Sequence, residues 1–316
     1  MKMKTMIRSS LIALVAIACL VPCTFAAPGG KQLTFGLVTK ALDNPFWSLM
    51  KDGAEKVAEA NGAKLIYLAP TKANNLEEQT RLVEDLIQRK VDGIVLVPVD
   101  SAGIVPVIER ANKAGIPIAL ANTNANGGQV VTFSAIENYD AMTIVTEFVM
   151  SKLGGKGKVI ILEGAPGAQT TTDRLRAMTD VIKKYPGITL LASQPADNQR
   201  AKGMQVMDNL LQTYTTVDAI LCNNDEEALG AIEALDSAGR LGKTMVAGFD
   251  GNDDALNAIS QGRMLVSMNQ NPQKQAADAL QALIDIIAGK SVPKRIVTQG
   301  ILLTKDNVAL YLPAAK

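Results

Sequence analysis

Short apolar runs alternate with longer amphipathic segments from about residue 31 onward, and this alternation limits the fold more than any other feature. Five runs in the first half have the length and composition of strands: Leu33–Val38, Leu65–Leu68, Ile94–Val97, Ile118–Ala121 and Val130–Ser134. The segments between them place apolar residues on one helical face, as Met50, Ala54 and Val57 do. Strand, helix, strand in this order requires parallel pairing with right-handed crossovers. We therefore predict an α/β fold with doubly wound parallel sheets.

The same pattern starts again near residue 159. Strands are expected at Val159–Leu162, Thr189–Ala192, Ala219–Cys222, Val246–Phe249 and Leu265–Met268, with helices near 172–185, 200–213, 225–238 and 253–261. The segments 91–96 and 217–222, VDGIVL and VDAILC, resemble one element used twice. Two similar α/β halves are therefore expected, with no Pro-, Gly- or Ser-rich linker between them. A further helix at 271–288 and a strand at Arg295–Val297 fit either half.

The complete absence of histidine removes several classes of enzyme. A chain with His 0 has no imidazole general base, no Ser-His-Asp or Cys-His nucleophile system and no imidazole metal ligand. The formal net charge of +1 includes three positive residues of the N-terminal segment, so it gives no electrostatic signature of nucleic-acid binding. We expect neither a cofactor nor a bound metal.

The first 26 residues have the pattern of a secretory signal peptide. Lys2, Lys4 and Arg8 precede the apolar stretch 11–21, and small residues at Thr24 and Ala26 predict cleavage after Ala26. A permanent membrane anchor would need a longer apolar stretch. Lipid attachment at Cys19 is the other alternative, although Ala16-Ile17-Ala18 is a weak match to a lipoprotein signal. After cleavage only Cys222 remains, and its apolar surroundings predict a buried strand thiol.

Polar and aromatic residues gather where the predicted strands end. These ends carry Asp43 to Trp47, Asn122 to Asn124, Gln169 to Arg174, Asn198, Asn223 to Glu226, Phe249 to Gly251 and Asn269 to Asn271. In open parallel sheets, ligands bind beyond the carboxyl ends of the strands. Amides, a carboxylate, a guanidinium and aromatic faces are the groups that recognise neutral polyhydroxyl compounds. The alternatives are structural: Asn224 or Asp225 caps a helix, and Phe46 packs a helix onto its sheet.

Other motif-like strings lack essential residues. Gly164-Ala165-Pro166-Gly167 is not followed by Gly-Lys-Ser/Thr and is not a phosphate-binding loop. The string starting at Asp250 resembles a calcium loop, but it has Ala255 where a glycine is needed and Gln261 in place of the bidentate acid. We interpret it as a loop that begins a helix.

Four strings together resemble the ribose-binding protein family, the periplasmic sugar-binding components of ABC importers. They are NPFW at 44–47, QPAD at 194–197, NDEEALGA at 224–231 and VAGFDG at 246–251, and they occur in the family's order. The resemblance extends from about Leu33 to Val297. It implies two similar domains joined by three crossings that close on a ligand. The implied domains are residues 31–135 with 269–297, and residues 136–268 with 298–316.

The resemblance also implies a set of ligand contacts. Positions that match the family's residue types are Asn44, Phe46, Arg174, Asn224, Phe249, Asp250 and Gln270, and Trp47 replaces a second phenylalanine. Asn122-Thr123 stands where the family has an Asp-Arg pair, and Asn198 stands where it has an aromatic ring. The clamp is therefore expected to hold a monosaccharide or sugar alcohol other than ribose.

The function expected from the resemblance is a periplasmic, monomeric binding protein that delivers its ligand to a membrane ABC permease. One alternative is a secreted enzyme acting on a sugar, which would need an acid/base pair or metal site. Another is a sensor that presents its ligand to a chemoreceptor. Repressors of the lac type share this core, but a leader occupies the end where they carry a DNA-binding helix-turn-helix.

Overall fold

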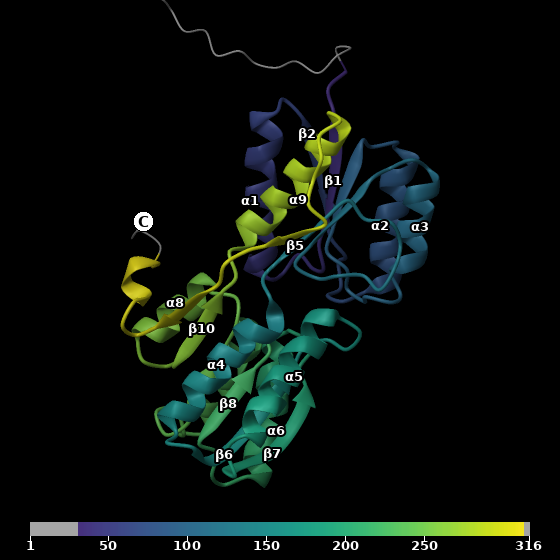
Figure 1. The fold of residues 1–316 in the computed structure, drawn as a ribbon. Helices are drawn as coiled ribbons and strands as arrows, with labels where there is room; N and C mark the ends of the chain where they lie inside the picture. Colours follow the sequence, from purple (N-terminus) through teal and green to yellow (C-terminus); the bar gives the residue numbers. More distant parts are fainter. Residues whose placement is uncertain (1–30, 313–316) are drawn as a thin grey trace, which may run out of the picture.

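The computed structural model describes residues 31–312, in which two α/β lobes lie one above the other (Figure 1). The predicted signal peptide lies outside the described residues. In the first lobe a six-stranded sheet has the order β11-β5-β4-β3-β1-β2, and all its pairs are parallel. Its strands are β1 (Thr34–Val38), β2 (Lys64–Leu68), β3 (Gly93–Leu96), β4 (Ile118–Ala121), β5 (Phe133–Ala135) and β11 (Arg295–Val297).

The second lobe repeats this arrangement in the order β12-β10-β9-β8-β6-β7. Its strands are β6 (Lys156–Glu163), β7 (Gly187–Pro195), β8 (Ala219–Cys222), β9 (Met245–Ala247), β10 (Val266–Asn269) and β12 (Ile301–Thr304). All neighbours are parallel except β12, which runs antiparallel to β10 along one edge. The prediction of two doubly wound α/β domains is confirmed, whereas strand β12 was not predicted.

Helices cover both faces of each sheet. On the first sheet, α1 (Pro45–Ala60) and α9 (Pro272–Ile287) pack on one face, and α2 (Leu76–Gln88) and α3 (Val105–Lys113) pack on the other. On the second sheet, α4 (Asn138–Lys152) and α5 (Gln169–Lys183) oppose α6 (Arg200–Thr213), α7 (Asp225–Ser237) and α8 (Asp253–Ser260). A short 3-10 turn, η1 (Val308–Leu310), lies beside α8 near the C-terminus (Figure 1).

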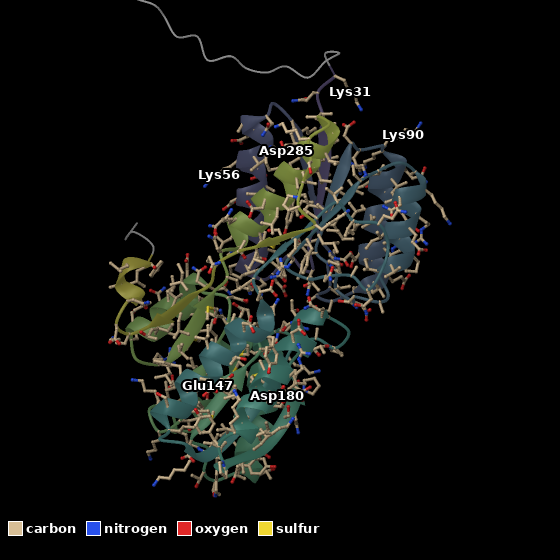
Figure 2. The ribbon with its side chains drawn as sticks, in the orientation of Figure 1. Lys31, Lys56, Lys90, Glu147, Asp180 and Asp285 are labelled. Carbon is tan, nitrogen blue, oxygen red and sulfur yellow. The ribbon has the colours of Figure 1, made fainter. Side chains whose placement is uncertain are left out.

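Strand side chains alternate between the two helix layers, as the two-residue period of a strand requires. In β6, for example, Ile160 belongs to the core under α6 and α7, whereas Ile161 belongs to the core under α4 and α5. Cys222 is 1% exposed in β8, and burial raises the pKa of its thiol, as expected for a core cysteine. Lys56 and Lys90 lie on the outer surface of the first lobe (Figure 2).

The chain passes between the two sheets three times. The crossings follow β5, β10 and β11, so that α9 and β11 return to the first lobe and β12 ends in the second. Helix α4 was not predicted, because its apolar residues are spread around the helix and give little amphipathic signal. The crossings bring the carboxyl ends of both sheets to face each other.

Candidate functional site

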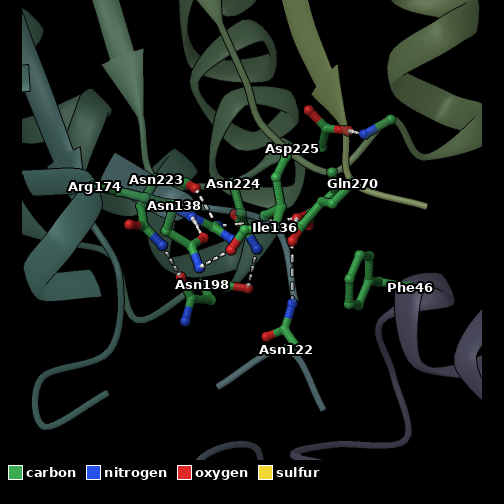
Figure 3. A network of polar contacts seen from close by, with 12 residues as sticks. Phe46, Asn122, Ile136, Asn138, Arg174, Asn198, Asn223, Asn224, Asp225 and Gln270 are labelled. Carbon is green, nitrogen blue, oxygen red and sulfur yellow. Dashed lines mark hydrogen bonds and ion pairs between the residues drawn. The ribbon is translucent and has the colours of Figure 1, made fainter. Parts of the chain in front are cut away.

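A cavity of about 490 Å³ lies between the facing strand ends of the two lobes. Its walls come from the segments that follow β1, β2 and β4 in the first lobe and β6, β7, β8, β9 and β10 in the second, so each lobe contributes one side. This volume lies within the range of small-molecule sites. Figure 3 shows the polar side chains of the second lobe on one side, with Asn122 and Phe46 opposite them.

Nine of the eleven predicted site residues line this cavity. They are Asn44, Phe46, Trp47, Asn122, Arg174, Asn198, Asn224, Asp250 and Gln270. Thr123 and Phe249 do not line it: both are fully buried behind the wall. The Thr123 hydroxyl donates to Asn122 Oδ1 at 3.1 Å, and the Phe249 ring lies under the Arg174 guanidinium, 3.9 Å from ring centre to Cζ. Each supports a residue of the cavity wall without being part of it.

The aromatic side of the cavity is built on the first turn of α1. Asn44 caps this helix, because its Oδ1 accepts a hydrogen bond from the backbone N–H of Phe46 at 2.9 Å. Pro45 follows at the first helical position, where its fixed φ fits and no N–H is needed. The cap therefore places Phe46 and Trp47 side by side, with ring centres 4.9 Å apart and planes at 88°.

Three wall residues have backbone conformations that favour Asn, Asp or Gly. Asn122, Asn198 and Asp250 have φ values of 60°, 61° and 146°. Such conformations cost free energy for most residues and cluster at functional sites. Here they turn the chain sharply at the strand ends, so that the side chains enter the cavity.

Arg174 and Asp250 form the charged centre of the second lobe's wall. Arg174 Nη1 lies 4.0 Å from Asp250 Oδ1, and both side chains are at least nine-tenths buried. Arg174 Nε donates to Asn138 Oδ1 and its Nη1 to the Asn223 carbonyl, each at 2.9 Å. Burial lowers the pKa of Arg174 to about 10 and raises that of Asp250 well above its usual range. The pair is fixed in place, with the second terminal nitrogen of Arg174 left for a ligand.

Amide side chains connect this charged centre to the first lobe. Asn122 Nδ2 donates to Gln270 Oε1 at 3.1 Å and to Gln275 Oε1 at 3.3 Å, and Gln270 Nε2 in turn donates to Asp250 Oδ1. Gln270 follows β10 at a crossing, so this chain of hydrogen bonds passes from one lobe to the other (Figure 3). The amides orient one another and the Asp250 carboxylate.

Two buried carboxylates support the wall from behind, at the start of α7. Asp225 accepts from the backbone N–H groups of Gly251 and Asn252, and burial raises its pKa to about 6. Glu227 accepts from those of Asn198 and Asn223, and burial raises its pKa to about 8. Asn224 caps α7, which was the structural alternative to a ligand-binding role in the sequence analysis, and it also lines the cavity. The acids therefore fix the loops that carry the wall residues.

Sequence reasoning missed Lys40, which lines the cavity from the first lobe and is 4% exposed. Its ammonium nitrogen lies 6.0 Å from the Trp47 ring centre. Burial lowers the pKa of Lys40 to about 7, and the nearby positive charge of Arg174 adds to this effect. Lys40 lies two residues beyond β1, so the strand-end rule that selected Asn122 could have identified it as well.

Lys40→Met is expected to stabilise the ligand-free protein in a pH-dependent manner. The folded pKa of about 7 lies below the unfolded value near 10.4, so the cost of burying this lysine is full below pH 7. That cost decreases as the pH rises and disappears near pH 10.5. We expect the melting temperature to rise by several degrees at pH 6 and by less than about one degree at pH 10. Equal shifts at both pH values, or the same result for exposed Lys56→Met, would contradict the assignment.

Charges at the rim of the cavity are largely paired. Arg200 forms ion pairs with Glu226 at 3.0 Å and Asp254 at 2.7 Å, and Lys202 pairs with Asp197 at 3.1 Å. Within residues 31–312 no group of acidic or cysteine side chains has the arrangement of a metal site. Over the same residues, no helix has the length and apolar character needed to span a membrane.

Comparison with known proteins places the chain among binding proteins with this architecture. Residues 35–291 match the family model described as a periplasmic binding protein domain. The ribose import binding protein RbsB of Bacillus subtilis is 38% identical over 266 residues, covering 84% of this chain and 85% of its own. The chain therefore belongs to the periplasmic binding protein family, and the resemblance to ribose-binding proteins is confirmed.

Solved structures agree in fold. A solute-binding protein of an ABC transporter from Actinobacillus succinogenes with bound D-allose superposes with a TM-score of 0.84 at 29% identity, covering 89% of this chain and 100% of its own. One from Bacillus halodurans with bound myo-inositol gives a TM-score of 0.83 at 30% identity, covering 90% and 99%. Both are carbohydrate- or polyol-bound members of the same architecture.

Proposed function

We propose that this chain is a periplasmic solute-binding protein that encloses a monosaccharide or sugar alcohol between its lobes and delivers it to an ABC permease. The observation that carries the proposal is the cavity itself. It combines the Arg174–Asp250 pair, several amides and one aromatic wall, and it draws on both lobes. These groups pair with adjacent hydroxyls and cover an apolar C–H face. The D-allose and myo-inositol bound by related proteins are polyhydroxyl compounds of this kind, with adjacent hydroxyls and apolar C–H faces.

The domain boundaries and the route of export belong to this proposal. We assign residues 31–135 with 269–297 to one domain and residues 136–268 with 298–316 to the other, with the three crossings as the hinge. The three passages between the sheets support this division. Cleavage after Ala26 would release the mature chain as a periplasmic monomer. Transport and presentation of the ligand to a chemoreceptor are compatible, because the two roles differ in the partner and not in the fold.

We also propose that the chain binds without catalysis. Asp250 lines the cavity, and its carboxylate already accepts a hydrogen bond from Gln270 and pairs with Arg174. A general acid or base needs a proton-transfer route to its substrate, whereas this carboxylate is arranged to accept hydrogen bonds. Recovery of the bound compound in altered form after incubation would favour the enzyme alternative.

Closure of the two lobes on the ligand is the step that an experiment can test directly. The two lobes already contact each other through hydrogen bonds at the edges of the cavity. Ser101 N donates to the Gly167 carbonyl at 3.0 Å, and Gln169 N donates to Ser101 Oγ at 3.0 Å. Asn74 Nδ2 donates to the Asp197 carbonyl at 2.9 Å. A ligand that contacts both lobes favours this closed form by its differential affinity. Small-angle scattering should therefore show a smaller radius of gyration with saturating ligand, and an unchanged profile would contradict the clamp.

Gly167→Ala is expected to impair closure. A Cβ at Gly167 would lie 2.1 Å from Asp100 Oδ2, across the interface between the lobes. We expect affinity to fall about tenfold for every ligand alike, because the substitution disfavours the closed state itself. Gly154→Ala is the matched control: it has the same left-handed backbone, with φ +65° against +86°, but open space around its Cβ. Equal effects of the two substitutions in calorimetry would assign the loss to backbone strain instead.

A further inference from the structure

Two loops of the second lobe are tied together at the point where an aromatic ring would be expected. Asn198 follows β7 and Asn223 follows β8, and Asn223 Nδ2 donates to Asn198 Oδ1 at 2.7 Å. Both residues line the cavity. Their side chains form a continuous amide surface, here called the amide wall, opposite the first lobe (Figure 3).

A single buried carboxylate holds both halves of the amide wall. Glu227 Oε1 accepts from Asn198 N at 2.7 Å, and Glu227 Oε2 accepts from Asn223 N at 2.9 Å. Glu227 is fully buried and does not itself line the cavity. One side chain accepts from both loops at once, so Glu227 fixes their spacing, and a glutamine in its place would offer one acceptor oxygen instead of two.

Gly164 provides the space that the amide wall needs. A Cβ at this position would lie 2.3 Å from Asn223 Nδ2, 2.5 Å from Asn198 Oδ1 and 2.6 Å from Thr171 Oγ1. Any larger residue would therefore push the two amides apart. The glycine belongs to the Gly164–Gly167 string that lacks the residues of a phosphate-binding loop, and its packing role explains why it is present.

The amide wall leaves one group for a ligand, the amide nitrogen of Asn198. Asn223 Oδ1 is fully buried and does not open onto the cavity. The Oδ1 of Asn198 is held by Asn223, and its amide N–H groups remain as donors. A ligand hydroxyl oxygen can accept from them, whereas a C–H face leaves them unpaired.

We propose that the amide wall selects ligands that place a hydroxyl against the Asn198 amide, which Asn223 orients, and that Glu227 and Gly164 are positioning residues for this selection. The proposal rests on the proposed function and names the ligand chemistry of one side of its cavity. It assigns discrimination to two residues that do not touch the ligand. Their substitution is therefore expected to change which ligand binds best, in addition to how tightly any ligand binds.

The test is titration calorimetry with ribose, D-allose, myo-inositol and xylitol. The quantity compared is the ratio of the dissociation constant for ribose to that for the tightest ligand of the four. We expect Gly164→Ala, Glu227→Gln and Asn198→Gly each to lower this ratio by about tenfold, the effect of one lost hydrogen bond. Asn198→Gly deletes the amide without backbone strain, since glycine accepts the φ of 61°.

Two matched substitutions separate selection from stability. Gly36→Ala places a Cβ 2.3 Å from a Leu86 side-chain carbon in the first lobe, as close a contact as at Gly164. Glu163→Gln alters a carboxylate of β6 that accepts from Ser193 and does not line the cavity. Both controls are expected to leave the ratio within about twofold, even where they lower the melting temperature.

The outcomes distinguish this inference from the proposed function. An unchanged ratio in Asn198→Gly and Glu227→Gln would overturn the inference, and so would a wild-type protein that binds ribose most tightly. Either result leaves a sugar-binding protein in place. If the wild-type protein binds none of these four compounds, and none of the common hexoses and the alditols of four to six carbons, the proposed function is overturned, and the amide-wall assignment with it.

Discussion

Arg174→Ala is expected to weaken ligand binding by about a hundredfold or more, the largest effect of any single substitution in the cavity. Hydrogen bonds to charged groups contribute about 1.5–3 kcal/mol each, and this change removes the charged terminal nitrogen that Arg174 holds free for the ligand. It also leaves the buried Asp250 carboxylate without its ion-pair partner, which lies 4.0 Å away in the wild-type protein. Titration calorimetry with the tightest ligand measures the effect directly.

Asp250→Asn tests the acceptor half of the same pair. The amide keeps the shape of the carboxylate but loses its charge, and it can no longer accept from Gln270 and the ligand through two equivalent oxygens. We expect a loss of about tenfold to a hundredfold. Because burial raises the pKa of Asp250, the effect is expected to be weaker at low pH, where the wild-type carboxyl is protonated and therefore uncharged, than at high pH.

Arg176→Ala is the matched control on the same helix. Arg176 is exposed, pairs with Asp173 at 3.3 Å and lies over the Tyr139 ring. Exposed pairs contribute about 0–1 kcal/mol, so its removal should leave affinity within about twofold. Affinity that stays within threefold in both Arg174→Ala and Asp250→Asn, with unchanged circular dichroism, would show that this charged centre is not the polar anchor.

The general position of the cavity follows from the sequence because strand ends are easy to recognise. A buried strand ends where apolar residues give way to polar ones, and parallel strands bring those ends to one edge. Asn122, Asn198 and Asp250 were found in this manner, although their strands β4, β7 and β9 are far apart in the chain. The positive φ values that direct these side chains into the cavity are ones that Asn and Asp adopt more readily than most residues. The presence of Asn or Asp at these positions does not by itself predict a positive φ.

Side-chain direction was harder to predict. Phe249 and Asp250 are adjacent, yet one packs into the core under α4 and α5 and the other faces the cavity, because successive side chains of an extended chain point to opposite sides. Thr123 turns back onto Asn122 for its hydrogen bond. These outcomes depend on the local backbone, which the residue types do not specify.

The positioning residues were hidden from the sequence for a different reason. Glu227 lies in a run of three acids at 225–227, and acids in the first turn of a helix are favoured by the helix dipole whichever way they point. In the structure Asp225 and Glu227 turn inward to accept backbone N–H groups, and Glu226 reaches Arg200 at the rim. Their partners come from other loops, so only the assembled fold shows what the acids do.

A melting screen is expected to show that ribose is not the preferred ligand. Ligand at about 100 times its dissociation constant stabilises the folded state by about 2.7 kcal/mol, which gives a clearly visible shift in melting temperature. The screen compares ribose, common hexoses and alditols of four to six carbons at equal concentration. We expect an alditol, or a sugar other than ribopyranose, to give the largest shift.

The physical reason lies in the asymmetry of the cavity. Phe46 and Trp47 provide a stacking surface from the first lobe, whereas the second lobe presents the amide of Asn198 in place of a ring. Asn122 stands where ribose-binding proteins carry an acid, and its amide nitrogen donates to Gln270 and Gln275, so it offers a ligand no charge and only its remaining acceptor capacity. A flat pyranose would find one stacking face instead of two. An acyclic alditol carries a hydroxyl on every carbon and has no flat face, so it would use the amides more fully.

The outcome of the screen separates the two parts of this argument. If ribose gives the largest shift, the substitutions at Asn122 and Asn198 do not control selection, and the argument from the missing ring is wrong. If a hexose gives the largest shift, the departure from ribose stands and only the preference for an alditol is lost. A hexose has two pyranose faces like ribose, and its preference would then come from the additional hydroxymethyl group meeting the amides that ribose leaves unpaired.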